Sequence, residues 1–472
     1  MDYIKPIGGF SCMVSPVLLR SVLKRITPSP VDLTAEEKMA RFLIRKIKST
    51  KGKHLHAILA GSIARNTHLR GDRDLDIFVF YPPTLSRERF EKEGLKLGHS
   101  VFGDNEHEEA YSEHPYIRGV INGFNVEIVP TYKVKTARDK MAAVDRTPFH
   151  AEYMRKHLSK KQQGEVRLLK QFMKGVSVYG ADVKMQGVPG YLAEILILEY
   201  GTFVSTLQHV SKWGNPTIVD VEKYYANAPA IWNAFSSTFL VVVDPTDPSR
   251  NVAGALSLNQ FSRFVASARA FLSKPSESFF FSHLQHAFAL SDIRRMLKRE
   301  EWEGTLFPYP SNILEDVVWG QLGRISKKFA HALERHDFVF RRYFIWTDGK
   351  TKCAILFDVE NPVLQSSKKR MGPPVLDENA CARFLKAHPS PISGPRIEDG
   401  RIIVIEKRPL DTIGKALSHE WKALVLTESK EWKPFLQKGE TLSESHILAW
   451  AKKDTAFCQS LGHYLRGKES FW

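Results

Sequence analysis

The sequence predicts a multidomain α+β protein, and three observations lead to this fold class. The chain has 472 residues, of which 43% are hydrophobic, so at about 150 residues per domain it can form three or so packed cores. Its first 135 residues alternate helical stripes with short β-branched and aromatic runs. Hairpin signals occur in both halves, at Asn122-Gly123 and Asp348-Gly349. We expect domains at residues 1–150, 151–275 and 276–472.

The first domain is predicted to hold a mixed sheet with helices. A helical stripe, two apolar strands, a second helix and a hairpin follow one another over residues 33–47, 54–60, 74–81, 85–98 and 116–134. The strand at 74–81 and the second strand of the hairpin are expected in one sheet. The segment "DNEHEEA" (104–110) is predicted to be a solvated loop.

The second domain is predicted to be mainly helical and basic. Residues 155–174 contain seven Lys or Arg against one acid, Glu165. Residues 189–210 are predicted to form one buried helix, because apolar side chains surround it. A buried strand at 239–245 precedes a polar loop, "TDPSRN", and a capping box of Ser257 and Gln260 then begins a helix.

The third domain is predicted to be α+β. Its expected elements are a helix through residues 318–333, a hairpin of 338–347 and 352–360, a basic loop at 365–374, a strand at 400–409 and helices beyond. No internal repeat is evident.

Charge and composition indicate what kind of partner the protein binds and in which cellular compartment it lies. The net charge of +16 indicates a polyanionic partner. No apolar run approaches the roughly 18 residues that span a bilayer, and the first 19 residues lack the pattern of a signal peptide. The four cysteines are far apart and form no CxxC pair, so we expect a cytoplasmic protein in a reducing environment.

The segment "GSIARNTHLRGDRDLDIFVFY" (61–81) carries the chemistry. On a strand, Asp74 and Asp76 point the same way, and two such carboxylates are best tolerated around a divalent metal. Gly61 and Ser62 would turn the preceding strand into a short helix whose free amides, with Arg65, suit a phosphate. The alternative is a strand end with solvated acids and a capping serine.

A third carboxylate would complete a site for two-metal phosphoryl or nucleotidyl transfer. Glu127 is the candidate, because it lies between Val126 and Ile128 on the second hairpin strand and points away from their apolar face. Its rivals Glu106, Glu108 and Glu109 lie in the predicted loop. A charged residue on a strand can also simply face solvent.

The ordered motifs resemble the archaeal (class I) CCA-adding enzymes, which are tRNA nucleotidyltransferases of the DNA polymerase β-type superfamily. The resemblance runs from about residue 15 to at least 374, through the segment above and "EHPYIRGVINGFNVEIVPTYKV", "AVDRTPFH", "VRLLKQFMKGVSVYGA", "GYLAEILILEYG", "VVDPTDPSRNVAGALSL" and "KRMGPP". It implies a polymerase β-like head, a helical neck, and an α+β body and tail. It also implies addition of C, C and A to tRNA from CTP and ATP with Mg²⁺.

The resemblance assigns roles residue by residue. It makes Asp74, Asp76 and Glu127 the catalytic, metal-binding acids, although relatives usually have Asp at the position of Glu127. It assigns nucleotide binding to Gly61, Ser62, Arg65, Thr147, His150, Lys170 and Tyr179. Arg250 matches an arginine that helps to select the base.

Basic residues in the third domain are the candidates for tRNA contact by shape and phosphate. They are Arg341, Arg342, Lys368, Lys369 and Arg370, and a solvated charge run is the alternative. A poly(A) polymerase-like terminal transferase and a silent RNA-binding protein stay open as other functions. The sequence also leaves a homodimer open.

Overall fold

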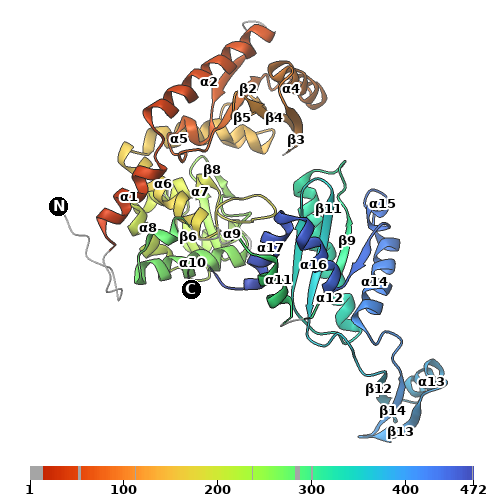
Figure 1. Ribbon diagram of the computed structural model, residues 1–472. Coiled ribbons are helices and arrows are strands. Elements are labelled where there is room, and N and C mark those ends of the chain that lie inside the picture. Colours follow the sequence, from red (N-terminus) through yellow and green to blue (C-terminus); the bar gives the residue numbers. More distant parts are fainter. Residues whose placement is uncertain are drawn as a thin grey trace. The chain divides into compact units, whose positions relative to one another are not determined.

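The computed structural model describes residues 14–51, 55–111, 113–235, 238–281, 287–298, 301–469 and 471. The chain divides into two compact units, residues 1–285 with 468–472 (unit 1) and residues 286–467 (unit 2), each with its own helices and sheets (Figure 1). The predicted multidomain α+β class is therefore confirmed, while the three-domain division stays a prediction. The chain start and His54 lie outside the described residues.

Unit 1 begins with a five-stranded sheet in the order β1-β2-β5-β4-β3. Its strands are β1 (His56–Leu59), β2 (Asp74–Tyr81), β3 (His107–Tyr111), β4 (Pro115–Ile121) and β5 (Phe124–Tyr132). β2 and β5 pair in parallel and the other pairs are antiparallel. The turn between β4 and β5 has positive φ at Asn122 and Gly123, which confirms the predicted hairpin.

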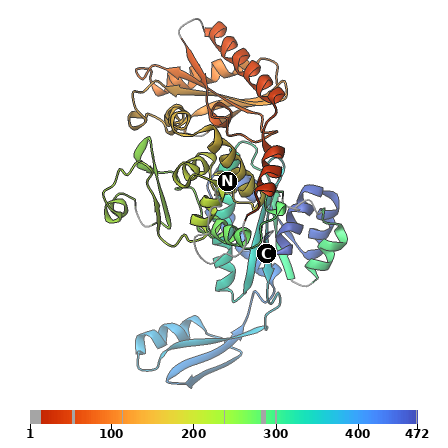
Figure 2. The ribbon, with the colours of Figure 1, turned by 90° about the vertical axis from the view of Figure 1, so that its left-hand side faces the viewer.

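Two helices cover one face of this sheet. α2 (Pro30–Lys51) and α4 (Arg87–Phe102) pack on the side chains of β2 and β5 that alternate toward them. Gly98 of α4 allows this close packing, because a Cβ there would lie 2.3 Å from Ile117 Cγ1. Figure 2 shows the strands of the sheet beside these helices. The other sheet face carries a small apolar cluster that includes Phe78 and Val129.

Helices dominate the rest of unit 1. They are α1 (Pro16–Ile26), α3 (Gly61–Ala64), α5 (Thr147–His157), α6 (Lys160–Gly175), α7 (Gly190–Tyr200), α8 (Phe203–Val210), α9 (Ala228–Ala234) and α10 (Leu258–Ser273). A three-stranded sheet of β6 (Thr217–Val219), β7 (Leu240–Asp244) and β8 (Asp247–Asn251) accompanies them. α1, α6, α7, α8 and α10 share one apolar core with β7.

Several predictions for unit 1 are wrong in detail. The single helix expected at 189–210 is two helices, because Gly201 takes φ +83° and Thr202 caps α8. The "TDPSRN" loop forms β8, which pairs with β7. The "DNEHEEA" loop forms most of β3, because it pairs with β4 at the sheet edge. Of the capping box at α10, only the Ser257 half forms, since the Ser257 backbone N–H donates to the Gln186 carbonyl instead of the Gln260 side chain.

Unit 2 is built on an antiparallel sheet in the order β10-β11-β9-β15. The strands are β9 (Glu301–Pro308), β10 (Phe340–Thr347), β11 (Lys352–Val359) and β15 (Glu440–Leu442). The helices are α11 (Leu290–Leu297), α12 (Glu315–Arg335), α14 (Ile413–Thr427), α15 (Lys433–Leu436), α16 (Glu444–Lys453) and α17 (Thr455–Arg466).

The position of β11 inside unit 2 explains why its sequence is a continuous apolar run. Cys353, Ile355 and Phe357 face a core with α12 and α14. Ala354 and Leu356, in between, face a second core with α11, α16 and α17. A strand covered on both faces has no polar side, so its residues do not alternate in polarity.

A small second sheet of unit 2 holds the predicted basic loop. Its order is β12-β14-β13, with β12 (Ser367–Pro374), β13 (Ser393–Glu398) and β14 (Arg401–Lys407), and α13 (Glu378–Ala387) packs on β12. The prediction of a loop at 365–374 is wrong, because residues 367–374 pair with the apolar strand β14. No helix in the described part of the chain combines the length and apolar character needed to cross a bilayer.

Candidate active site

The turn after β1 places the backbone against the Asp76 carboxylate. Gly61 opens α3 with φ +67°, and a Cβ built on it would lie 1.8 Å from Asp76 Oδ2. The Ala60 amide donates to the Asp76 carbonyl at 2.8 Å. Both the positive φ and the close approach require glycine here, so the predicted turn is joined directly to the acid strand.

Asp74, Asp76 and Glu127 lie on one face of the first sheet. In the parallel pairing of β2 with β5, Asp76 is the partner of Glu127 and Asp74 is the partner of Asn125. This face is opposite to the one that α2 and α4 cover. The Asn125 amide donates to Asp74 Oδ1 at 2.8 Å. The three predicted acids therefore belong to one cluster.

Burial and mutual repulsion raise the pKa of two of these acids. Burial, and then the charge of Asp74, raise the pKa of Asp76 to about 6, although Arg65 opposes the shift. Burial, and then the charge of Asp76, raise the pKa of Glu127 to about 7, although Arg118 opposes it. A positive ion between the two carboxylates would favour their ionised forms.

The chemistry of this cluster fits a divalent cation, because Mg²⁺ prefers carboxylate oxygens. In the described residues, however, no three His, Cys, Asp or Glu side chains are close enough to enclose an ion as they stand. An ion held here would take its remaining ligands from water or from substrate phosphates, as Mg²⁺ commonly does. The alternative of solvated acids describes Asp74, which is exposed, better than Asp76 and Glu127, which are half-buried.

Two of the three rival acids, Glu108 and Glu109, lie on another strand. β3, which carries Glu108 and Glu109, is at the sheet edge, separated from β2 by β5 and β4. Glu108 accepts from Arg118 Nε at 2.8 Å, and Glu109 from His99 Nε2 at 2.9 Å. These two acids therefore make surface ion pairs rather than joining the cluster.

Behind the Gly61 turn lies a buried ion network centred on Glu194 of α7. Arg65 Nε lies 2.7 Å from Glu194 Oε2, and Lys170 Nζ lies 3.3 Å from Oε1. The Thr67 hydroxyl donates to Oε1 at 2.5 Å. Burial raises the pKa of Glu194, but Arg65 and Lys170 outweigh it and leave that pKa below its usual range. Glu194 is thus a buried, ionised acid that holds Arg65 and Lys170, two residues predicted to contact the nucleotide.

Lys170 is more enclosed than its predicted role suggests. Its side chain is 2% exposed, and Nζ also donates to the Thr67 carbonyl at 3.2 Å. Burial lowers the pKa of Lys170 to about 8, although Glu194 opposes the shift. Tyr179 lies close by, because a Cβ on Gly190 would be 2.8 Å from the Tyr179 hydroxyl and 3.6 Å from Lys170 Nζ.

A cavity of about 290 Å³ opens beside this network. It is lined by Gly61, Arg65, Ala143, Val144, Arg146, Thr147, His150, Tyr191 and Arg250. Five of these residues were predicted from the sequence to bind the nucleotide or select its base. Ser62, Lys170 and Tyr179 do not line the cavity; Ser62 is half-buried in α3, and its carbonyl accepts from the Thr67 amide at 3.0 Å.

Asp244, at the end of β7, contacts three of the residues that line this cavity. Its Oδ2 lies 2.9 Å from His150 Nε2 and 2.9 Å from Arg250 Nη1. The Tyr191 hydroxyl donates to Oδ1 at 3.2 Å, and the His150 and Tyr191 rings stack with centroids 4.0 Å apart. Burial raises the pKa of Asp244, but bonding to His150 outweighs it and holds that pKa well below its usual range.

A second buried acid fixes the segment that leads into α5, the helix that carries Thr147 and His150. Asp145 accepts from the Thr131 hydroxyl and the Tyr132 amide of β5, both at 2.8 Å. It also accepts from the Met141 and Ala142 amides at 2.9 and 2.8 Å. The cavity wall is therefore tied to the strand that carries Glu127.

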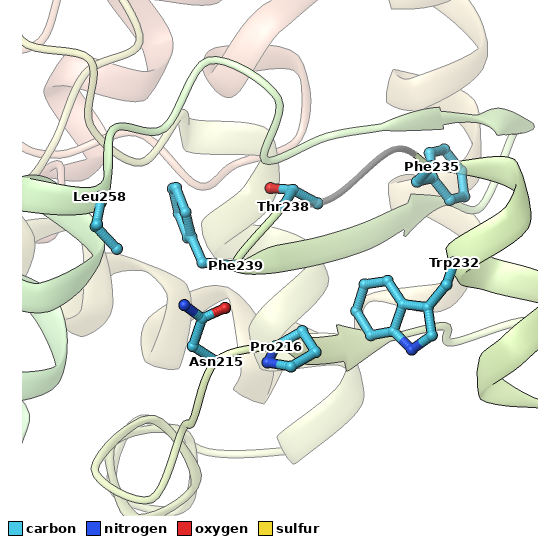
Figure 3. Close-up of a pocket in the computed structure, with 7 residues that line it drawn as sticks. All are labelled: Asn215, Pro216, Trp232, Phe235, Thr238, Phe239 and Leu258. Carbon is cyan, nitrogen blue, oxygen red and sulfur yellow. The ribbon is translucent and has the colours of Figure 1, made fainter.

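A larger cavity in unit 1, of about 720 Å³, has a different character. It lies around the beginnings of β6 and β7 and is lined by Asn215, Pro216, Trp232, Phe235, Thr238, Phe239 and Leu258. Figure 3 shows the rings of Trp232 and Phe239 beside Pro216. This lining contains no charged group that could bind a phosphate, unlike the lining of the smaller cavity.

The predicted tRNA contacts of unit 2 all have acidic neighbours. Lys369 Nζ lies 2.6 Å from Glu398 and Arg370 Nε 2.5 Å from Glu406. Lys368 pairs with Asp337. Arg341 and Arg342 share Asp358. The first three lie together on β12, and the two arginines lie on β10.

Sequence reasoning missed the acids that organise the site. Glu194 had a readable signal, because it lies between Ala193 and Ile195 in the most apolar part of a helix and a charge there must be paired. Asp244 ends a buried strand in the same way. Tyr191 gave no such signal, since an aromatic residue in an apolar helix is usually a core residue.

Family models match most of the chain in three segments. Residues 38–150 match the nucleotidyltransferase domain, residues 164–281 the second domain of tRNA nucleotidyltransferase, and residues 305–441 the C-terminal domain of the CCA-adding enzyme. The first two segments contain every residue of the candidate active site.

Curated relatives extend this similarity over almost the whole chain. A CCA-adding enzyme of Methanoregula boonei is 36% identical over 76% of this chain and 77% of the relative. One of Archaeoglobus fulgidus is 32% identical over 92% of this chain and 97% of the relative. A solved structure of the Cid1 poly(U) polymerase has 14% identity and a TM-score of 0.44, covering 56% of this chain and 96% of that chain.

Proposed function

The chain belongs to the family of CCA-adding enzymes, and from this premise we propose that Asp74, Asp76 and Glu127 are its catalytic acids. The enzyme adds C, C and A to the 3′ end of tRNA from CTP and ATP, without a nucleic-acid template, and releases pyrophosphate. The observation that carries the residue assignment is the pairing of Asp76 with Glu127 on one sheet face, directly against the Gly61 turn.

The three acids would hold Mg²⁺. When bound, the metal lowers the pKa of the attacking 3′ hydroxyl and neutralises charge on the leaving pyrophosphate. Glu127 would accept the proton of that hydroxyl as a general base. Its register opposite Asp76 supports this assignment.

The cavity beside Gly61 would bind the incoming nucleotide. Arg65 would contact the triphosphate from its position beside Glu194, and Thr147 and His150 line the same cavity. Lys170 would act through Glu194 and Thr67, which it contacts. Ser62 and Tyr179 flank this network.

Base selection would fall to Arg250. Its Nη1 is fixed by Asp244 at 2.9 Å, and it reaches the cavity next to His150. A guanidinium has only donors, so in this fixed position it would meet acceptors on the ring of C or A. U and G present a different donor and acceptor pattern at the Watson–Crick edge.

The remaining assignments follow from the family. Basic residues of unit 2, including those of β12, would contact tRNA phosphates, and residues 1–150, 151–275 and 276–472 would act as head, neck and body with tail. A cytoplasmic location agrees with the free thiols of Cys353, Cys381 and Cys458. A homodimer stays a prediction.

Extension of three tRNA transcripts tests the function. Transcripts ending before CCA, at C and at CC would receive Mg²⁺ with CTP, ATP, both, or UTP and GTP. We expect two C additions with CTP, one A on the CC end and then a stop, all lost in Asp76→Asn. Open-ended A addition to every transcript would instead support the poly(A) polymerase-like alternative, which the match to the CCA-adding C-terminal domain disfavours.

A further inference from the structure

A positively charged cavity of about 600 Å³ lies within unit 2, between α11, β10 and the end of α17. Four arginines and one acid line it, together with apolar side chains: Arg295, Arg341, Arg342, Arg466 and Asp358. The arginines come from three separate elements. Sequence reasoning identified only the two on β10.

A β-bulge turns the two consecutive arginines of β10 toward one acceptor. Neighbouring residues of a regular strand point to opposite faces, but the pairing of β10 with β11 shifts between Phe340 and Arg342. Arg341 Nη2 therefore lies 2.5 Å from Asp358 Oδ1, and Arg342 Nε lies 3.2 Å from Oδ2. Bulges often re-aim side chains at binding sites.

Asp358 positions these arginines without neutralising the cavity. Its side chain is 1% exposed, whereas that of Arg341 is 47% exposed. Arg295 and Arg466 are exposed as well, and Arg295 has its own neighbour, Asp292, at 2.8 Å. Among the described residues that line the cavity, one carboxylate lies with four guanidinium groups, so this lining is net positive.

The end of α17 is shaped around Arg342. Gly467 caps the helix with φ +60°, and a Cβ there would lie 3.0 Å from Arg342 Nη1. The same Nη1 donates to the Tyr464 carbonyl at 3.3 Å. Tertiary packing therefore holds the guanidinium in place, as a binding site requires.

We propose that this cavity binds a backbone phosphate of the tRNA substrate. The proposal rests on the proposed function, because tRNA is the polyanion that this activity brings to the protein. Guanidinium groups match phosphate oxygens in pairs, and the cavity presents them from three directions. Contacts to phosphate carry no base preference, which suits an enzyme that accepts every tRNA.

Protection of a sheet edge is the competing explanation. β10 is an edge strand, and charged side chains commonly block such edges from pairing. That explanation accounts for Arg341 and Arg342. It does not account for Arg295 and Arg466, which come from helices and face the same cavity.

The test uses the two helical arginines, because removing Arg341 or Arg342 would take a cationic neighbour from the buried Asp358. Arg295→Ala/Arg466→Ala is compared with Arg294→Ala/Lys452→Ala, which removes the same charge from α11 and α16 at exposed positions outside the cavity. Affinity of the full-length enzyme for a tRNA ending in CC is measured by fluorescence anisotropy over a range of salt. Thermal melting checks that both variants fold.

We expect the cavity variant to raise the Kd for tRNA about tenfold and to reduce the slope of log Kd against log salt by about one relative to the control. Its Kd for CTP and for pyrophosphate should not change. Equal tRNA affinity and equal salt slope in the two variants would overturn the proposal. A cavity variant that binds pyrophosphate more weakly, but binds tRNA as well as the control does, would also overturn it. Because the readout is binding, it decides the phosphate site even if tRNA extension fails.

Discussion

The active-site region contains two kinds of buried acid, and they behave in opposite ways. Glu194 and Asp244 are fully buried but have cationic partners within 3 Å, and the pKa of each is lowered. Asp76 and Glu127 face each other, and the pKa of each is raised. The first pair has its counter-charges within the protein, whereas the repulsion within the second pair is the reason that we propose a bound cation there.

The largest expected effect is on activity. Asp76→Asn removes a metal-binding oxygen, so kcat for adding A to a tRNA ending in CC should fall roughly 10³-fold. The same change removes a repulsive charge, so the unfolding temperature should stay equal or rise. Steady-state kinetics and thermal melting measure both. A drop in unfolding temperature would show that Asp76 is a structural acid like Glu194.

The opposite pattern is expected for Glu194→Gln. Loss of this carboxylate leaves Arg65 and Lys170 buried without their counter-charge, so the free energy of unfolding should fall by about 3 kcal/mol. KM for CTP should rise more than kcat falls, because Arg65 loses its position. Denaturant unfolding and initial rates measure these effects. Glu199→Gln, at an exposed position of the same helix, is the control and should behave like the wild type.

The raised pKa values predict that the stability of the metal-free protein, kept in a chelator, depends on pH. Folded Asp76 and Glu127 bind more protons than the unfolded chain between their ordinary pKa values and about 6 and 7. Their contribution to stability is therefore present at acid pH and lost as pH rises toward neutrality. Between pH 4 and pH 8 the free energy of unfolding of the wild type should fall by on the order of 2 kcal/mol more than that of Asp76→Asn. Parallel pH profiles for the two proteins in denaturant unfolding would contradict this expectation.

The smallest effect on stability and on nucleotide preference is expected for Tyr191→Phe, a change beside the fully buried acid Asp244. Tyr191→Phe removes one hydrogen bond to Asp244 but leaves His150 and Arg250 in contact with it. The free energy of unfolding should fall by about 1 kcal/mol, and the preference for CTP over UTP should change less than in Arg250→Ala. Competition between labelled CTP and UTP measures the preference. A larger loss in Tyr191→Phe than in Arg250→Ala would move base selection to the tyrosine.

Local sequence patterns predicted the elements that carry the acids. The strand at 74–81 and the Asn122-Gly123 hairpin are present with the expected residues, because alternation and turn chemistry are local properties. The strands at 107–111, 247–251 and 367–374 were predicted as loops. They are polar segments whose strand character comes from pairing with another strand, which a local pattern does not contain.

The same distinction applies to the site. Acids spaced two apart on one strand are visible in the sequence, and so is a glycine-serine turn. The partnership of Arg65 and Lys170 with Glu194 joins residues 24 to 129 positions apart in the chain, so only the folded structure reveals it. The bulge that aims Arg341 and Arg342 at Asp358 likewise depends on strand register.

Metal binding to Asp76 and Glu127 tests the central claim most directly. Mn²⁺ would be titrated into the wild type, Asp76→Asn and Glu194→Gln, with free Mn²⁺ followed by electron paramagnetic resonance. We predict saturable binding in the wild type that persists in folded Glu194→Gln and is lost or strongly weakened in Asp76→Asn. Equal Mn²⁺ binding by the wild type and Asp76→Asn would contradict the assignment of the cation to this cluster.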